Sequence, residues 1–538
     1  MKKIVVWGLG KVGLEFVKEH SETEIEFIID NDINKCGNDI NGIKIVHSKD
    51  VVDWNRNFYV IAVLQNSEIV RFLTEKGLVH HKDFVIYDEY VEHYQPEKLI
   101  DEIESFLAHI EKKSYLGKRL VFSHFIYVRE GRQMVDFWNF HNEATRDLLL
   151  FCDADDAINP IVYKQANFQI ELMPKLLRKP GTILEALRDV CITPDIETYV
   201  KSKEELNWVC NNLKLTYPEA SNDACIYVTF YSDYVIRRIM KYIKPSMTIV
   251  FNSFRTWHYI VNHISAEYNV PVKYCEFGPI EGTFQFDDMG LMGETTPCME
   301  WKQFDNAPIK IEDKKSADQI INYMYCTKIN RYAQPKGNIK SEILNHFSSQ
   351  GPLIIYMGQN DYEAGIQPYT LRAKELHSPV FSSSAEAANY LLDICKKAGY
   401  NFVYKPHPSM NNVGNKLCEC AEDMYIIRNG DINDVIDCAD VAITINSTVA
   451  YASMIRNKPT ILLGYMQLSH HGCCYECYKK DEIVKTIQYA LQEKITEKMF
   501  NKFIDHVARM VNFYLYDTMM QRELPYGKRD KDIFLKGN

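Results

Sequence analysis

Hydrophobic runs of strand length alternate with amphipathic segments along three stretches of the chain. In the first, KIVVWG precedes the helical pattern VGLEFVKEH, and the run IEFIID follows. The second stretch has four predicted strands, RLVFSH, ACIYVTF, MTIVFN and VPVKYCEF. The third stretch has five predicted strands, PLIIYMG, YNFVYKP, DMYII, DVAITI and PTILLG. Strands that alternate with helices indicate parallel βαβ packing, so we expect an α/β protein with three successive units.

Amphipathic stretches separate and follow these units. EKLIDEIESFLAHIEKK has apolar residues at i, i+3 and i+4, which predicts an exposed linker helix. MFNKFIDHVARMVNFYLYD predicts a C-terminal helix, for which packing on the preceding domain is favoured over a membrane surface. The expected division is a Rossmann-like module in 1–92, the linker helix in 93–115, α/β halves in 116–332 and 333–495, and the C-terminal helix and tail in 496–538.

Composition narrows the function classes. The 538 residues carry a net charge of −10 without a long basic block, so no nucleic acid partner is expected. No run approaches a membrane span, and the N-terminal apolar run breaks at glycines, which indicates a strand rather than a signal peptide. The 15 cysteines then indicate reduced thiols in a cytoplasmic protein. HHGCCYEC has no second ligand pair, so a Cys-rich loop is favoured over a metal site.

Three glycines in the first unit form a phosphate-binding pattern. Gly8, Gly10 and Gly13 have G-x-G-x-x-G spacing after a strand, and Asp30 ends the next strand, where a ribose hydroxyl is usually held. The unit is short for a full dinucleotide domain, and it resembles small Rossmann-like modules attached to sugar-modifying enzymes and sugar acyltransferases. NAD, another nucleotide, a sugar nucleotide and a purely structural role remain alternatives.

Polar residues follow several strands of the third unit. Lys405 and His407 follow NFVY, and Asn446, Ser447 and Thr448 follow VAITI. Ligands bind at the carboxyl ends of parallel strands, so these side chains are expected at one site. Ser447 or Asn446 can cap the next helix, whose N–H groups would hold a phosphate. His407, stiffened by a proline on each side, is placed to donate a proton to a departing phosphate.

Acidic and amide residues at other strand ends are further candidates. Gln359 and Asp361 follow PLIIYMG, and Glu276 ends VPVKYCEF as a base or substrate ligand. The hydrolase elbow G-x-S-x-G and the P-loop pattern are missing from the sequence.

Four ordered motifs resemble the capsule polysaccharide biosynthesis family, which includes Kdo transferases. They are CEFGPIEGTFQFDDMG, GQNDYEAGIQ with HSPVFSS, VYKPHP, and ITINSTVAYASMIRNKPTILLG, and they span about residues 245 to 470. The resemblance implies two facing Rossmann-like domains of the glycosyltransferase B type, here preceded by the small Rossmann-like domain. The implied catalytic residues are Glu276, Asp361 and His407, and the implied donor ligands are Gln359, Lys405, His407, Asn446, Ser447 and Thr448.

The resemblance also implies an activity. It predicts a bacterial, metal-independent glycosyltransferase that moves a sugar from a nucleotide-activated donor, CMP-linked by preference, to a surface or capsular polysaccharide or a glycolipid. The acceptor half is 116–332 and the donor half is 333–495. Such an enzyme needs no cofactor beyond its donor, and it is compatible with peripheral association with an assembly complex at the inner face of the membrane.

Two other functions remain open. One is a polyol-phosphate transferase of the teichoic-acid type, which would use CDP-glycerol or CDP-ribitol. The other is a non-catalytic sugar-nucleotide-binding protein that works through the N-terminal glycines. One departure from the family bears on this choice, because the pattern S-T-V-G-x-E-A is replaced by STVAYAS, with Tyr451 and Ser453 near the place of the glutamate.

Overall fold

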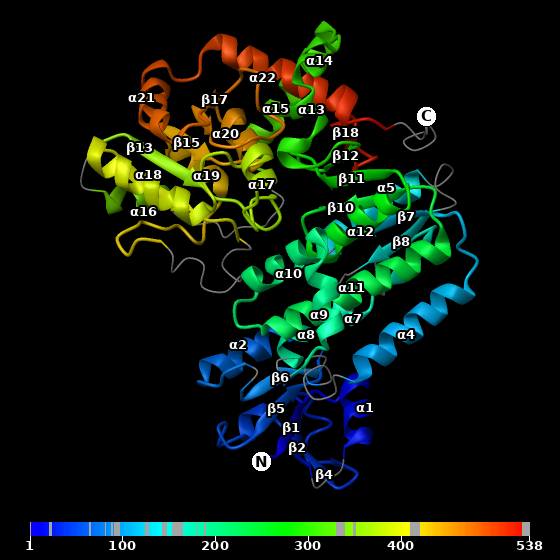
Figure 1. Cartoon of the computed structure of the whole chain (residues 1–538). Coiled ribbons are helices and arrows are strands. Elements are labelled where there is room, and N and C mark those ends of the chain that lie inside the picture. The colour runs from blue at the N-terminus through cyan, green and yellow to red at the C-terminus, as the bar shows by residue number, and fades with distance from the viewer. Residues whose placement is uncertain are drawn as a thin grey trace.

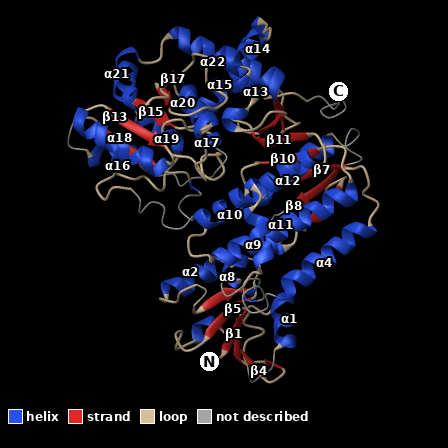
Figure 2. Ribbon diagram, viewed as in Figure 1, coloured by secondary structure: helices blue, strands red, loops and turns tan. Residues whose placement is uncertain are grey.

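Three β-sheets follow one another along the chain, and Figure 1 shows their units from bottom to top in sequence order. A computed structural model describes most of the residues. The described residues are 2–20, 24–63, 66–80, 82–87, 90, 97–123, 128–141, 148–152, 165–178, 180–187, 190–329, 339–347, 351–408 and 420–529. Helices cover the sheets of all three units (Figure 2). The predicted α/β fold class is confirmed.

The first unit has a six-stranded sheet in the order β3-β4-β2-β1-β5-β6. Neighbours are parallel except β3 and β4. The central strands β1 and β5 are buried on both faces, as parallel strands inside a sheet require. The strands are β1 Ile4–Trp7, β2 Ile25–Ile29, β3 Asp39–Ile40, β4 Ile43–Val46, β5 Phe58–Ile61 and β6 Phe84–Ile86, and the helices are α1 Lys11–Glu19 and α2 Ser67–Glu75.

The second unit has a seven-stranded sheet in the order β18-β12-β11-β10-β7-β8-β9. The β11–β12 and β12–β18 pairs are antiparallel, and the other neighbouring strands are parallel. The strands are β7 Arg119–Ser123, β8 Leu148–Cys152, β9 Gln169–Leu172, β10 Thr248–Phe251, β11 Val272–Phe277, β12 Thr283–Asp287 and β18 Leu515–Asp517. The helices are α4 Glu97–Lys112, α5 Val128–Phe140, α7 Lys175–Arg178, α8 Pro180–Ala186, α9 Pro194–Lys201, α10 Glu204–Thr216, α11 Asn222–Ile243 and α12 Thr256–Glu267.

One predicted strand of this unit is wrong, because ACIYVTF lies inside helix α11. The Ser221 side chain caps the helix by accepting from the Ala224 N–H at 3.1 Å. Val228, Ile236 and Ile239 and their neighbours are buried at helical spacing along it. The β-branched and aromatic residues favoured a strand, but the capping residue and the 3.6-residue period of the whole segment decide for a helix.

Helix α4 confirms the predicted helix between the first and second units, but its apolar face is covered. Leu99, Ile103, Leu107 and Ile110 belong to the core of the second unit. The helix is therefore packed on this unit and is more than an exposed linker.

The third unit has five parallel strands in the order β14-β13-β15-β16-β17. The strands are β13 Leu353–Met357, β14 Asn401–Lys405, β15 Val441–Thr444, β16 Thr460–Leu462 and β17 Tyr475–Glu476. The connection from β12 to the third unit contains α13 Thr296–Met299, α14 Trp301–Asn306, α15 Ile311–Thr327 and α16 Ile339–His346. The helices after β13 are α17 Leu371–Leu376, α18 Ser384–Ala398, α19 Ile432–Cys438, α20 Val449–Ile455, α21 Ile483–Glu493 and α22 Glu497–Arg509.

The predicted strand DMYII is wrong as a strand. Ile426 forms a single isolated bridge with Tyr404 of β14. The pairing does not extend because the chain turns at Gly430, whose φ is +121°, and enters α19.

The C-terminal segment returns from the third unit to the second, as Figure 1 shows. The predicted helix is present as α22, and its packing within the molecule is confirmed by the buried Phe503 and Val507, which share a core with Ile320 of α15. The helix does not run to residue 517 as expected, because a π-helical turn, Met510–Tyr514, leads into β18. The expected domain boundaries at 92 and 332 lie outside the described residues and stay predictions, and the tail beyond 529 does too.

Candidate active site

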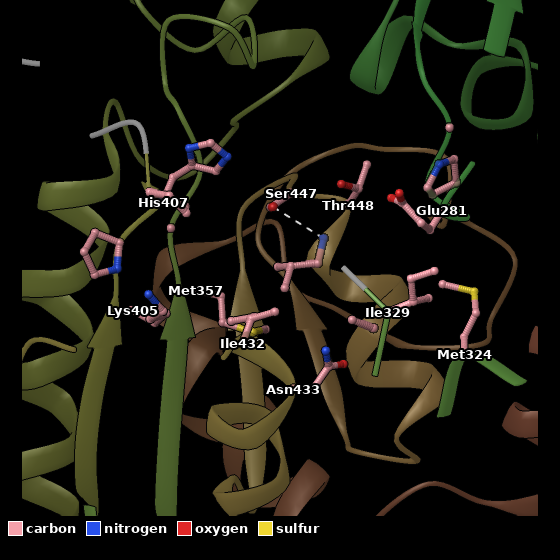
Figure 3. A pocket seen from close by; sticks show the side chains of 17 residues that line it. Glu281, Met324, Ile329, Met357, Lys405, His407, Ile432, Asn433, Ser447 and Thr448 are labelled. Carbon is pink, nitrogen blue, oxygen red and sulfur yellow. Dashed lines mark hydrogen bonds between the residues drawn. The ribbon is translucent and has the colours of Figure 1, made fainter. Parts of the chain in front are cut away.

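A cavity of about 160 Å³ lies where the third unit faces the loop after β11 of the second unit (Figure 3). Gly278, Pro279 and Glu281 line it from the second unit, and strand ends of the third unit line it from the other side. Its polar side chains are Glu281, Lys405, His407, Asn433, Ser447 and Thr448.

The sheet of the third unit brings these strand ends together. Strand β13 lies between β14 and β15, with Met357 opposite Lys405 and Tyr356 opposite Ile443. In a parallel sheet the carboxyl ends meet at one edge, so the residues after each strand share one site. Of the predicted residues, Lys405, His407, Ser447 and Thr448 all line the cavity.

Lys405 is a buried cation at this cavity. Its side chain is at the end of β14, the residue is 4% exposed, and Nζ donates to the Arg428 carbonyl at 3.0 Å. Burial lowers the pKa of Lys405 to about 8, although the nearby Asp431 acts in the opposite direction. A buried ammonium that lines a cavity favours an anionic ligand there, because the ligand supplies the charge that burial removed from water.

His407 stands between Pro406 and Pro408, and all three residues line the cavity. Each proline fixes its own backbone φ near −65°, so the turn that carries the imidazole is stiff. Figure 3 shows His407 and Lys405 on one side of the cavity and Glu281 on the opposite side. The site therefore has basic groups on the third unit and a carboxylate on the second.

The N-cap residue of helix α20 is Thr448, so the predicted cap by Ser447 or Asn446 is one or two residues too early, but the Ser447 side chain does bond to the first residue of the helix. The Ser447 Oγ accepts from the Val449 N–H at 3.4 Å, the contact drawn in Figure 3. Thr448 makes no side-chain capping bond and lines the cavity with its neighbour. Asn446 is buried and its Nδ2 donates to the Ala364 carbonyl at 3.0 Å, so Asn446 supports the chain after β13 and is not part of the cavity lining.

Gln359 and Asp361 lie next to the cavity lining and not in it. The Asp361 carboxylate accepts from the Ser384 N–H at 2.8 Å, the Ser384 Oγ at 2.6 Å and the Gln359 Nε2 at 2.7 Å. These bonds join the two ends of the segment 362–383, which leaves the third unit between β13 and α18. The contacts explain why an acid and an amide occur at this strand end, and their proposed roles toward the donor remain predictions.

Glu276 is likewise outside the cavity lining. Its carboxylate accepts from Asn252 Nδ2 at 2.8 Å and from the Phe277 N–H at 2.9 Å, and Asn252 also donates to the Glu363 carbonyl at 3.2 Å. Glu276 therefore supports the contact between the second unit and the segment 362–383. Its predicted catalytic role is untested.

Glu281 is the acidic residue of the cavity, and it is absent from the residues predicted from sequence. It comes five residues after Glu276 in the same CEFGPIEG motif. Gly282 has a φ of +79°, and the turn 278–282 moves the chain out of β11 before β12 begins. The signal that could have identified it is this Gly-Pro turn, which exposes the acid that follows a strand rather than the acid within it.

The segment 362–383 closes against the second unit. Arg372 Nε of α17 lies 2.5 Å from a carboxylate oxygen of Glu294, which is 6% exposed. A Cβ added at Gly293 would lie 1.7 Å from the Leu376 carbonyl oxygen, so the two backbones are in close contact. Burial acts to raise the pKa of Glu294, but hydrogen bonds and charges from His377 and Arg372 outweigh it, so the pKa of Glu294 is lowered. The buried carboxylate of Glu294 and the Arg372 side chain, which is 55% exposed, thus form an ion pair between the second unit and the segment 362–383.

The departure at Tyr451 also has a structural explanation. Tyr451 is 1% exposed, and its hydroxyl is hydrogen-bonded to His506 Nε2 of α22 at 2.8 Å. Its side chain belongs to the core between α20 and α22. Ala452, the next residue of α20, lines the cavity instead, so the helix presents no acid to the site from this turn.

The glycine loop of the first unit has its predicted backbone features. Gly8 has a φ of +104°, and a Cβ at Gly13 would lie 2.0 Å from the Gly8 carbonyl oxygen. Asp30 accepts from the Leu9 N–H at 3.0 Å and forms an ion pair with Lys35 at 2.9 Å. Burial acts to raise the pKa of Asp30, but the bonds from the Asp32 N–H, Lys35 and the Leu9 N–H outweigh it, so the pKa of Asp30 is lowered. Nucleotide binding by Gly8, Gly10, Gly13 and Asp30 stays a prediction.

The cysteine-rich loop HHGCCYEC is packed in the core. Cys473, Cys474 and Cys477 are buried free thiols. His471 is bound through Nδ1 to Asp305 at 2.8 Å and through Nε2 to the Pro297 carbonyl at 3.1 Å. Among the described residues, no group of three or more His, Cys, Asp and Glu side chains is arranged to hold a metal ion.

In the described part of the chain, no helix is both long and apolar enough to cross a bilayer.

Solved structures with a similar fold include two Kdo transferases. The Thermosulfurimonas dismutans KpsC beta Kdo 2,7 transferase is 16% identical, with 52% of this chain and 81% of that chain covered and a TM-score of 0.33. The beta Kdo 2,4 transferase of the same name and organism is 12% identical, with 50% and 80% covered and a TM-score of 0.34. A S. aureus MnaA structure with UDP is 10% identical, with 72% and 91% covered and a TM-score of 0.32.

No protein-family model matches the chain, and no curated protein matches it. The identities to these solved structures are below 25% and the TM-scores below 0.5, so the likeness assigns no function to this chain.

Proposed function

We propose that this protein is a glycosyltransferase that moves a sugar from a nucleotide-activated donor to a polysaccharide or glycolipid acceptor. The observation that carries the proposal is the buried Lys405 at a cavity that also presents His407 on the same side and Glu281 on the other. A nucleotide donor has a phosphate that must be held and, as the sugar leaves, must accept additional negative charge.

The side chains of the cavity suit this chemistry. The Lys405 ammonium would hold the phosphate next to the sugar, and the hydroxyls of Ser447 and Thr448 would donate to its oxygens. His407 would donate a hydrogen bond or a proton as the charge develops. Donors fixed in advance toward the leaving group lower the barrier without having to reorganise. This scheme requires no metal ion.

The apolar part of the cavity offers a place for a nucleoside. Ile432, Met324 and Ile329 line it, and Asn433 adds an amide. Asn433 Nδ2 already donates to the Lys328 carbonyl at 3.2 Å and to Asp431 at 3.1 Å, so its side chain is held in place. We favour a CMP-linked donor because the motifs resemble the capsule family, and CDP-glycerol is the donor that would indicate a polyol-phosphate transferase instead.

The test is a panel of CMP-, UDP- and GDP-linked sugars together with CDP-glycerol and CDP-ribitol. Nucleotide release is measured with the full chain, with His407→Ala, and with His80→Ala, whose histidine lies in the first unit, as the matched control. We expect release from one sugar donor, its loss in His407→Ala and its retention in His80→Ala. If no donor gives release that depends on His407, the proposal is wrong, and release from CDP-glycerol alone would assign the polyol-phosphate activity.

A further inference from the structure

A cluster of basic residues lies in the second unit, away from the candidate active site. Two segments form this basic cluster, 112–119 with the sequence KKSYLGKR and 241–244 with the sequence KYIK. Together they contain six lysine and arginine residues and no aspartate or glutamate, in a chain whose net charge is −10. The basic cluster is therefore a local exception in an acidic protein, and its charge favours an anionic partner.

Hydrogen bonds hold the two segments of the basic cluster together. The Gly117 N–H donates to the Ile243 carbonyl at 2.7 Å, and the Tyr242 hydroxyl donates to the Lys113 carbonyl at 3.0 Å. Helices α4 and α11, which lie side by side in Figure 1, both end here. The fold thus makes one surface from residues that are up to 129 positions apart in these contacts.

Four lysines of the basic cluster are available to a partner. Their side chains are exposed, and none of them forms an ion pair with another described residue: Lys112, Lys113, Lys241 and Lys244. Glu111, the acid that precedes the basic cluster in α4, is already paired with Arg238. The positive charge of the four ammonium groups is therefore not neutralised by this neighbouring acid.

An exposed apolar side chain belongs to the same surface. Leu116 is 70% exposed. In its turn the Lys118 N–H donates to the Tyr115 carbonyl at 3.1 Å, and Gly117 has a φ of +76°, as in a type II turn. The Tyr115 side chain is buried and bonded to Glu171, so it anchors the turn and leaves Leu116 at the tip. A helix C-terminus favours nearby lysines, but it does not account for an exposed leucine.

Lysines around a protruding leucine have the chemistry of a membrane interface. Each lysine near an anionic bilayer strengthens binding about fivefold, and a leucine that enters the boundary of the acyl chains leaves water. Tyr268, which is 42% exposed and lines a small cavity with Lys241, adds an aromatic ring of the kind that is enriched at such interfaces. A nucleic acid or another soluble polyanion would pair with the lysines but would gain nothing from the leucine.

We propose that the basic cluster docks this protein on an anionic lipid bilayer, with Leu116 inserted at the boundary of the acyl chains. The basic cluster lies at the amino ends of β7 and β10, whereas the candidate active site follows the carboxyl end of β11 in the same parallel part of the sheet. The six residues of β11 span about 20 Å. Docking would therefore leave the candidate active site open, at the edge of the sheet away from the bilayer.

Docking is tested by co-sedimentation of the full chain with vesicles. One set contains one part phosphatidylglycerol to three parts phosphatidylcholine, and the other contains phosphatidylcholine alone. We expect binding to the anionic vesicles only, and binding about 100-fold weaker or less in the combined variant Lys112→Ala, Lys113→Ala, Lys241→Ala and Lys244→Ala. The matched control changes four exposed lysines elsewhere and should bind as the unmodified chain does: Lys315→Ala, Lys374→Ala, Lys485→Ala and Lys498→Ala. Equal binding by the two combined variants, or no binding to the anionic vesicles, would overturn the proposal.

Insertion of the leucine is tested with Leu116→Ser. Leu371→Ser is the matched control, because Leu371 of α17 is 71% exposed. We expect Leu116→Ser to bind the anionic vesicles about tenfold more weakly and Leu371→Ser to bind them as the unmodified chain does. Equal binding by these two variants would contradict insertion, and binding to heparin without binding to vesicles would assign the lysines to a soluble polyanion instead. None of these measurements uses a sugar donor, so their failure would leave the proposed function in place.

Discussion

The glycine loop of the first unit and the cavity of the third unit have residues of the kind that bind phosphates, but they use their polar groups differently. In the loop, Asp30 accepts from the Leu9 N–H and pairs with Lys35, so the acid and an amide of the loop already have partners within the protein. In the cavity, Lys405 is buried and donates to a carbonyl oxygen, and no carboxylate of the described residues forms an ion pair with it.

The difference shows what a sequence motif leaves undecided. The same residue types can complete one another or can be available to a ligand, and the outcome depends on which groups the fold places within hydrogen-bonding distance. For this reason the cavity is the stronger candidate for an anion site, although the glycine motif is the easier of the two to recognise. Four predictions test this comparison.

The largest expected effect is on the stability of the glycine loop. Gly13→Ala should cost on the order of 3 kcal/mol of the stability of the first unit, because the new Cβ would lie 2.0 Å from the Gly8 carbonyl oxygen. Gly10→Ala is the matched control, since nothing lies within 4 Å of a Cβ at that position. Hydrogen exchange of β1 and β5 measures both. Equal protection in the two variants would show that the close packing of the loop is not what stabilises it.

Removal of the buried cation should have the next largest effect. Lys405→Met should weaken binding of the nucleotide that the donor panel identifies by about 100-fold, the loss expected for a charge-assisted hydrogen bond, and should not lower thermal stability. Lys458→Met is the control, because Lys458 is a half-buried lysine whose Nζ also donates to carbonyl oxygens, those of Asp437 and Ala439. Calorimetric titration compares them, and equal affinities would move the anion site away from Lys405.

The pH dependence of the same binding should be smaller. The pKa of Lys405 is about 8, so the ammonium loses its proton as the pH rises through this value. Nucleotide affinity should therefore be constant below pH 7 and fall by up to about tenfold per pH unit above 8. Lys405→Arg should give a flat profile, since a guanidinium stays charged over the range. A wild-type affinity that rises with pH would contradict the assignment.

The smallest effect concerns the ion pair of the glycine loop. Lys35→Ala should lower the stability of the first unit by about 0.5 kcal/mol, because the Lys35 side chain is 39% exposed and solvent screens its charge. Lys44→Ala, at an exposed position of β4, is the control. Denaturant titration followed by hydrogen exchange separates the two. If Lys35→Ala also gives the first unit the ability to bind a nucleotide, the ion pair between Lys35 and Asp30 is what keeps Asp30 from a ligand in the unmodified chain.

Much of the fold could be predicted from the sequence. The alternation of apolar runs with amphipathic segments predicted β1, β2, β7, β10 and β11 and four of the five strands of the third unit, β13, β14, β15 and β16. It missed β17 and placed a strand at DMYII, where the structure has a single bridge. The local pattern failed at ACIYVTF, because strand-forming residues there are part of a longer helical period that a seven-residue window does not contain. It also missed β18, whose pairing with β12 joins residues more than 200 positions apart.

About half of the residues predicted for the candidate site line the cavity. Lys405, His407, Ser447 and Thr448 follow consecutive strands of one parallel sheet, and the topology of such a sheet places them together. Glu276, Gln359, Asp361 and Asn446 occur at equally favourable strand ends, yet their side chains bond to the protein. Periodicity does not contain this distinction, because it depends on partners such as Ser384 and Ala364 that the folded chain brings near.

The sequence by itself determined the three α/β units, the glycine turn and the basic strand ends of the third unit, because short-range patterns and parallel topology are sufficient for these. Only the tertiary structure decided which acid faces the basic cavity. Glu281 lies in a loop of one unit and Lys405 at a strand end of another, and no local pattern relates them. Packing of the second unit on the third, through Glu294 and Arg372 and the returning C-terminal segment, sets their position.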